Sequence, residues 1–268
     1  MKIQAALLSL GMVSAAFCLD EYQPIEQKKA EIDVGYSGTF INGSYDADGK
    51  KSDVPSGLSP MVTQIPIQVK YGIMTGLDVE LGWTFESDNE DVSGTAASGF
   101  MQPDIAVKYS LMDMGLAVFV DVNLPMATGD FSPPSGGSTL SLGIAPGVVY
   151  GKNFGKIQAV GALAYQVNLE NGDKYKNGNV LNVFLKPGYS VDDALGVYLG
   201  LQYTMASEDE FDGTAITGTD GNAFVIKPGA TYTLSKMLAF EANIPYVLSG
   251  MNTFGYWGIS AAVYVTVP

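Results

Sequence analysis

The side chains that most often exchange protons near neutral pH are missing from this chain. It contains no histidine, and its single cysteine is Cys18. Hydrolases built on a serine and histidine pair are therefore excluded, as are the usual zinc sites, which need histidine or cysteine ligands. We expect a protein without catalytic residues, metal centre or cofactor.

Carboxylates are the remaining candidates for metal chemistry, and they gather in two clusters at 86–91 and 208–212. Oxygen ligands suit hard cations such as calcium, but neither cluster matches the twelve-residue calcium loop. The clusters are interpreted as solvated loop charge. A structural calcium site and divalent cations bridging to anionic surface lipid are the alternatives.

A third set of ionisable residues alternates with apolar residues and would lie on one face of extended strands. Lys70 and Asp78 flank one predicted turn, and Lys108 and Asp121 flank the next, so cross-strand ion pairs are expected, as between Lys227 and Glu241. The face would either line a charge-selective passage or form a paired network that plugs the interior. The full set is Lys70, Asp78, Glu80, Asp104, Lys108, Asp121, Lys186, Lys227 and Glu241.

The elements that position these residues show hydrophobicity with a period of two, which indicates β-strands. In 77–86, for example, Leu77, Val79 and Leu81 share one face, and Asp78 and Glu80 share the other. No stretch after residue 20 has the 18 apolar residues of a spanning helix. About twelve strands are predicted, at 31–41, 61–72, 77–87, 102–111, 116–124, 139–151, 156–168, 179–190, 194–205, 222–233, 238–247 and 255–267.

The connections between these strands alternate in length. The short ones are 72–76, 112–115, 152–155, 191–193 and 235–237, whereas 42–60, 87–101, 126–138, 170–178 and 206–221 are long, without an apolar period, and interpreted as solvated loops. Outer-membrane barrels have short periplasmic turns and long extracellular loops. The predicted fold is therefore all-β: a single antiparallel up-and-down transmembrane β-barrel.

The N-terminus predicts export. Lys2, an apolar stretch and the small residues Ser14 to Ala16 are typical of a signal peptide at residues 1–18. Residues 19–30 would form a periplasmic segment, and 31–268 the barrel. Phe17 disfavours lipid attachment at Cys18, and cleavage there would leave no cysteine for a disulfide.

Composition narrows the function further. The net charge of -14 disfavours nucleic acid, which is bound through lysine and arginine. The 32 glycines, 15 tyrosines and 12 phenylalanines suit strands and turns. A soluble secreted β-sandwich remains an alternative, because its apolar strand faces would pack against each other as a core instead of contacting lipid.

A repeated pattern of proline followed by tyrosine ends every second strand, at Pro66, Pro103, Pro146, Pro187 and Pro228. Its tyrosines would sit near the short turns, where an amphipathic ring favours the membrane boundary, as a periplasmic aromatic girdle. They are Tyr71, Tyr109, Tyr150, Tyr189 and Tyr232.

This hairpin pattern, clearest at 103–109, resembles the outer-membrane family named after the meta-pathway of phenol degradation, over residues 31 to 268. The resemblance implies a transporter-like barrel, in some members linked to uptake of aromatic or other apolar compounds. Such barrels usually end in an aromatic residue read by the assembly machinery, whereas this chain ends in Pro268. Either Tyr264 would substitute for that residue, or the signal would differ.

The sequence thus predicts a bacterial outer-membrane protein that is not an enzyme. The leading hypothesis is a passive, porin-like channel or transporter for small solutes, including hydrophobic or aromatic ones. The alternative is a structural or surface-interaction barrel with a plugged lumen. Expected partners are outer-membrane lipid, lipopolysaccharide, the barrel assembly machinery and a small solute.

Overall fold

A computed structural model describes most of the chain. The predicted signal peptide lies outside the described residues, as do parts of the predicted connections at 112–115 and 126–138. The described residues are 23–111, 114–131 and 140–268.

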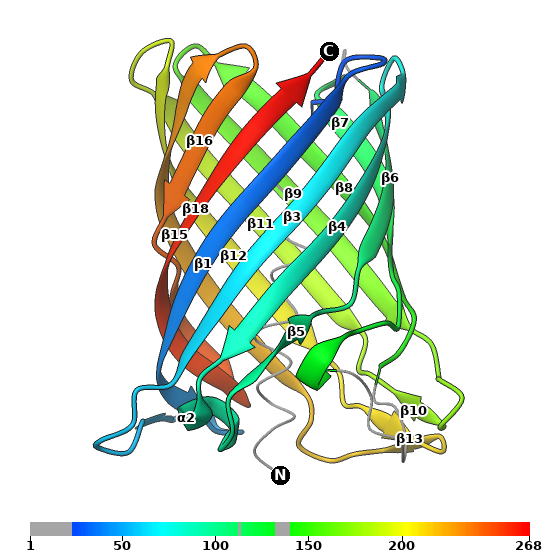
Figure 1. The fold of residues 1–268 in the computed structure, drawn as a ribbon, viewed down its shortest axis with the longest axis vertical. Coiled ribbons are helices and arrows are strands. Elements are labelled where there is room, and N and C mark those ends of the chain that lie inside the picture. The colour runs from blue at the N-terminus through cyan, green and yellow to red at the C-terminus, as the bar shows by residue number, and fades with distance from the viewer. Residues whose placement is uncertain (1–22, 112–113, 132–139) are drawn as a thin grey trace.

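One antiparallel sheet curls into a closed cylinder of tilted strands (Figure 1). The first long strand, β1 (Ala30–Tyr45), pairs with the last, β18 (Thr253–Val267), from Ala30 opposite Val267 to Tyr45 opposite Thr253. Closure removes the free edges that an open sheet would expose. The wall has 12 strands, which confirms the predicted barrel.

Every wall strand lies next to its neighbours in sequence, as in an up-and-down barrel. β16 and β17 together make one wall strand, interrupted at Ile244 and Pro245. The remaining wall strands are β3 (Met61–Met74), β4 (Leu77–Asp88), β6 (Asp104–Leu111), β7 (Leu116–Asn123), β8 (Gly143–Phe154), β9 (Ile157–Asn168), β11 (Val180–Ser190), β12 (Leu195–Ala206), β15 (Gly221–Ser235), β16 (Leu238–Asn243) and β17 (Tyr246–Met251).

The predicted alternation appears as two different faces. On β7, Val118 and Val120 are each 45% exposed on the outside of the cylinder, whereas Ala117 and Asp121 are at most 2% exposed on the inside. Large apolar side chains on the outside and small or polar ones inside are the pattern of a barrel that contacts hydrocarbon. None of the described residues forms a helix long and apolar enough to cross a membrane.

The two ends of the barrel differ as predicted. Short turns close one end, where Gly76, Gly115 and Gly155 have positive φ angles that favour glycine. The C-terminus lies at this end, and the long connections lie at the other (Figure 1). The long connections hold β2 (Lys51–Asp53), α2 (Glu90–Ser93), β5 (Ala97–Phe100) and the 3-10 helix η3 (Gly129–Phe131).

Two long connections that were expected to be simple solvated loops instead fold together. β10 (Tyr175–Lys176), β13 (Glu210–Phe211) and β14 (Thr214–Ala215) form a small separate sheet. The buried Asp209 accepts hydrogen bonds from the Tyr175 hydroxyl and from the Gly178 N–H. A two-residue strand leaves no periodicity to detect, so this sheet had no sequence signal.

Four of the five repeated prolines lie where the strand ladder is interrupted on one side, whereas Pro103 stands just before β6. The pairing of β1 with β3 skips Pro66, and the pairing of β11 with β12 skips Pro187. Pro146 is likewise skipped between β8 and β9, and Pro228 between β15 and the β16–β17 strand. Because proline has no N–H to donate, each can occupy a wall strand only at such a gap.

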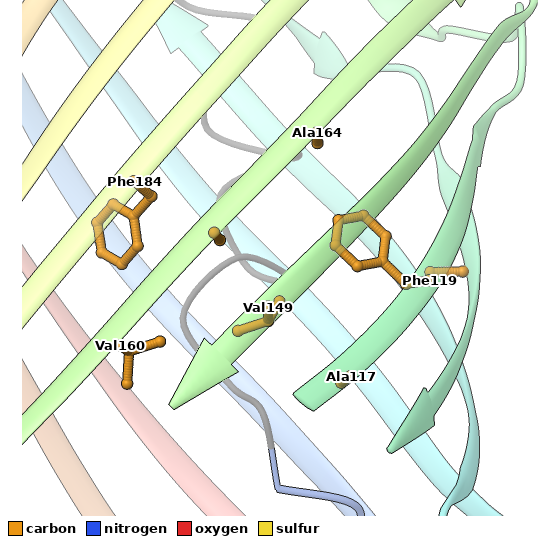
Figure 2. Close-up of a cluster of buried hydrophobic side chains, with 8 residues drawn as sticks. Ala117, Phe119, Val149, Val160, Ala164 and Phe184 are labelled. Carbon is orange, nitrogen blue, oxygen red and sulfur yellow. The ribbon is translucent and has the colours of Figure 1, made fainter. Parts of the chain in front are cut away.

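An apolar stripe lines part of the interior across β6, β7, β8, β9 and β11. The rings of Phe119 and Phe184 lie on either side of the small residues between them (Figure 2). Gly147 makes room for one ring, since an added Cβ would lie 2.2 Å from the Phe119 Cζ. The stripe consists of Ala106, Ala117, Phe119, Val149, Val160, Ala162, Ala164 and Phe184.

Residues before β1 pack against the short-turn end of the barrel. The Ile25 N–H donates to Asp78 Oδ1 at 3.1 Å, and the Lys28 N–H donates to the Gly72 carbonyl at 2.8 Å. An added Cβ on Gly72 would lie 2.4 Å from the Glu26 carbonyl oxygen. This part of the predicted N-terminal segment is thus bound to the barrel by hydrogen bonds and close packing.

Candidate functional site

The structure turns all nine predicted interior residues away from the outward face. Lys70, Asp78, Glu80 and Lys108 are at most 1% exposed, and Asp104 and Asp121 are at most 3% exposed. Lys186, Lys227 and Glu241 line an internal cavity instead. They occupy three charged groups, one of which includes two carboxylates that were not predicted.

The first group surrounds Lys70 on β3. Its Nζ lies 2.8 Å from Asp33 Oδ2 and 3.1 Å from Glu31 Oε1, both on β1. The expected partner was Asp78, which follows the turn on β4; the backbone register instead places Glu80 opposite Lys70 and Gly72 opposite Asp78. Lys70 thereby ties its strand to β1, the neighbour on the opposite side from β4.

The second group surrounds Lys108 on β6. Its Nζ lies 2.6 Å from Glu80 Oε1 and 4.0 Å from Asp78 Oδ2 on β4, whereas the expected partner was Asp121 on β7. Asp121 interacts electrostatically with Asp104 and Glu80, so carboxylates from three strands face one another. Gly82 leaves space for Asp104, whose Oδ1 lies 2.4 Å from where a Cβ would stand.

The third group surrounds Glu241 on β16. Its Oε1 accepts a 2.5 Å hydrogen bond from the Tyr198 hydroxyl, and its Oε2 lies 3.3 Å from the Tyr264 hydroxyl and 3.4 Å from Lys186 Nζ. Lys227, the expected partner, donates to Gln202 Oε1 at 2.7 Å. Lys186 comes from β11, and β12 and β15 lie between β11 and β16 in the wall. Barrel curvature therefore brings this pair together.

Charges are unevenly distributed around the interior. On β1, β3, β4, β6 and β7 buried carboxylates outnumber lysines: Asp33, Asp78, Glu80, Glu86, Asp88, Asp104 and Asp121 stand against Lys70 and Lys108. On β11, β12, β15 and β16 the charged residues lining the cavity are Lys186, Lys227 and Glu241. We refer to these two regions as the acidic wall and the basic wall.

The five predicted girdle tyrosines all point outward. Tyr71 and Tyr109 are each 46% exposed, Tyr150 and Tyr189 are 48% exposed, and Tyr232 is 47% exposed. Each lies close to a short turn, as the sequence pattern predicts. Near the other end, Phe40 stacks on Trp257 with ring centroids 4.6 Å apart.

The interpretation of the two acidic clusters as solvated loop charge is wrong for Glu86 and Asp88, which are buried in β4. Glu86 and Asp88 point inward from β4, where Glu86 accepts a 2.6 Å hydrogen bond from the Gln64 amide. In the other cluster, Glu210 pairs with Lys176 and Asp212 with Lys174. Among the described residues, no three acidic or cysteine side chains are grouped so that they could hold a metal ion.

The model of one protein family, described as the putative MetA-pathway of phenol degradation, matches residues 35–263, which is most of the barrel. The chain belongs to this phenol-degradation family. No curated protein sequence shows significant similarity to it.

Solved structures with the same fold are distant in sequence. An outer membrane channel from Pseudomonas putida F1 is 15% identical, with a TM-score of 0.75 over 92% of this chain and 98% of the other. The translocator domain of the autotransporter NalP from Neisseria meningitidis is 10% identical, with a TM-score of 0.54 over 96% of this chain and 94% of the other. At these identities the likeness shows the outer-membrane barrel fold alone.

Several interior residues of this family member escaped the sequence analysis. Glu31 and Asp33 were read only as the start of a strand, Tyr198 as part of the strand at 194–205, and Tyr264 as a substitute for a terminal aromatic residue. Their alternation with outward residues would have placed them inside. Their partners could not be found the same way, because the two-residue period gives neither the register with a neighbouring strand nor contacts beyond it, such as that of Tyr198 on β12 with Glu241 on β16.

Proposed function

We propose that this protein is a passive outer-membrane channel for small solutes. The observation that supports it most strongly is a closed barrel with an apolar outer face and an interior of charged clusters, an apolar stripe and a cavity of about 140 Å³. Hydrocarbon outside and polar groups inside suit a membrane pore. Lipopolysaccharide, outer-membrane lipid and the barrel assembly machinery are the partners that this location supplies.

The lumen residues would set the selectivity of this channel. Rings of Asp and Glu favour cations in other pores, and the acidic wall presents an excess of carboxylates. The apolar stripe beside that wall offers a surface for hydrophobic parts of a solute. The proposed passage is thus of mixed character, with a net preference for cations among simple ions.

A second candidate is a structural barrel with a sealed lumen. It is favoured by the pairing of Lys108 with Glu80, at 2.6 Å and with side-chain exposure of 1% and 0%. Such a buried network can stiffen a barrel without carrying solutes. No chemical reaction is part of either proposal.

Planar bilayer recording separates the two candidates. Insertion of the purified protein should give stepwise ion current, with a reversal potential in a potassium chloride gradient that indicates cation preference. The double variant Asp104→Asn with Asp121→Asn should lower that preference. Bilayers that contain inserted protein but stay silent would contradict the channel and support the sealed barrel.

A further inference from the structure

A cavity of about 140 Å³ lies against the basic wall, apart from the carboxylates of the acidic wall. Strands β11, β12, β15 and β16 supply its charged side, and β1 and β18 close the opposite side with Gly35, Ser37, Thr39 and Ser260 among other residues. Its charged lining residues are Lys186, Lys227 and Glu241, so cations exceed anions there.

Among the described residues that line the cavity, Glu241 is the one carboxylate, and several donors hold it in place. Glu241 takes a hydrogen bond from Tyr198 and lies near Tyr264 and Lys186. Lys186 also lies over the Tyr198 ring, 4.3 Å from its centroid. Lys227 is hydrogen-bonded to the neutral amide of Gln202. A second carboxylate in the cavity would therefore meet two fixed cations and only one anion.

The rest of the lining is largely apolar and aromatic. Phe184, Pro66, Pro245 and Tyr256 contribute to it, and Phe184 also ends the apolar stripe. A dry protein cavity of about 150 Å³ is known to take benzene, so this volume suits one aromatic ring. Gly200 also lines the cavity, where an added Cβ would lie 3.1 Å from Lys227 Cβ and 3.5 Å from the Phe184 ring.

We propose that this cavity is a binding subsite for a monocyclic aromatic carboxylate. The ring packs against Phe184 and Tyr256, and the carboxylate faces Lys227 and Lys186. The subsite deepens the proposed channel function and rests on it for its biological use. It explains why the basic wall joins the end of the apolar stripe: the two ends of such a molecule need these two surfaces.

Benzoate is the probe for this subsite, and benzyl alcohol is its neutral control of similar size. Calorimetric titration of the intact protein in a zwitterionic detergent should show saturable benzoate binding, corrected for empty micelles. Benzyl alcohol should bind at least about tenfold more weakly, because a hydrogen bond to a charged group contributes roughly 1.5–3 kcal/mol.

Three variants test the named residues. Lys227→Met should weaken benzoate binding by about tenfold or more, by loss of one charged donor. Ala262→Leu should weaken it similarly by filling the cavity while both lysines stay, since Ala262 lines the cavity opposite Glu241 in the strand register. Lys152→Met removes the same charge from an exposed position and should leave the benzoate affinity unchanged.

Absence of saturable benzoate binding to the folded barrel would overturn the proposal. Equal binding of benzyl alcohol, or unchanged benzoate affinity in Lys227→Met, would overturn it as well. Gel migration of the unboiled variants establishes that each is folded. A conducting barrel that does not bind benzoate disproves only the subsite, whereas a silent barrel that binds benzoate disproves only the channel.

Discussion

Lys108 is the residue on which the buried charge of the acidic wall depends most. Its ammonium lies 2.6 Å from Glu80 and 4.0 Å from Asp78, and all three side chains are essentially unexposed. Removing one member of a buried ion pair leaves an uncompensated charge, which is far more costly than replacing the whole pair. Loss of this one lysine would leave both Glu80 and Asp78 without its compensating charge.

Lys108→Met should therefore lower the free energy of unfolding by about 3–5 kcal/mol. Urea denaturation of the barrel folded in lipid vesicles would measure the change. Adding Glu80→Gln to the first variant should recover part of the loss, because the buried carboxylate is then neutral. A single variant as stable as the parent would contradict the role given to this ion pair.

The interior residues show what a sequence can and cannot predict at this scale. Alternation alone placed Lys70, Asp104 and Glu241 on the inner face, and the structure has them there. The partners of these residues could not be predicted from the alternation. Lys70 pairs with β1, the preceding wall strand, and Glu241 pairs with Lys186 from a non-neighbouring strand. The two-residue period determines which face of the strand a side chain occupies, whereas strand register and barrel curvature determine which residue it contacts.

At the scale of elements, the segment before β1 is held to the barrel by Gly72. The close approach of the Glu26 carbonyl, at 2.4 Å from where a Cβ would stand, leaves no room for a side chain. Lys28 and Lys29 exchange backbone hydrogen bonds with Gly72. A larger residue at this position must displace the segment.

Gly72→Val should thus free the segment and speed tryptic cleavage after Lys28 and Lys29 several-fold. Mass spectrometry of timed digests would follow the cleavage. Gly172→Val is the matched control, because nothing lies within 4 Å of a Cβ added there. Equal cleavage rates in the two variants would show that the contact at Gly72 does not hold the segment.

The turn between β11 and β12 depends on one carboxylate. Asp192 Oδ1 accepts hydrogen bonds from the N–H groups of Leu195 and Ala194, both at 2.8 Å, and these bonds lower the pKa of its carboxyl below the usual 3.8. A lowered pKa means that the ionised form favours the folded turn. Its contribution is present above pH 3.8 and is lost as the pH falls through the lowered value.

Asp192→Ala should accordingly increase the amide exchange of Leu195 and Ala194 near neutral pH, as measured by hydrogen–deuterium exchange. Asp193→Ala, one residue along the same turn, is the control. Protection that is the same in the parent and in Asp192→Ala would contradict the capping role.

Elements were predicted well where they were long and regular. All wall strands were anticipated, although β1 extends to Tyr45 and the eleventh wall strand breaks at Pro245. The small sheet of β10, β13 and β14 was missed, because contacts between two distant loops, such as Tyr175 with Asp209, create it. The proline repeat could be read from the sequence, but only the strand pairing shows that Pro66, Pro146, Pro187 and Pro228 sit at gaps in the ladder.

At the scale of the whole molecule, the barrel separates three surfaces. Its outside is apolar, its acidic wall carries most of the buried carboxylates, and its basic wall adjoins the apolar stripe. The predicted barrel and its membership of the phenol-degradation family agree with one another. The division of the lumen emerges only from the closed structure, where strands far apart in sequence face each other.

The assignment of the two faces is the claim on which the channel, the girdle and the lumen sites all depend. The chain has no cysteine after Cys18, so single cysteines can be introduced and labelled with a fluorophore. Val118→Cys and Val120→Cys should be quenched strongly by lipids with a spin label on the acyl chain, and Ala117→Cys should not. Equal quenching at all three positions, or the reverse pattern, would contradict a barrel whose alternate residues face hydrocarbon and lumen.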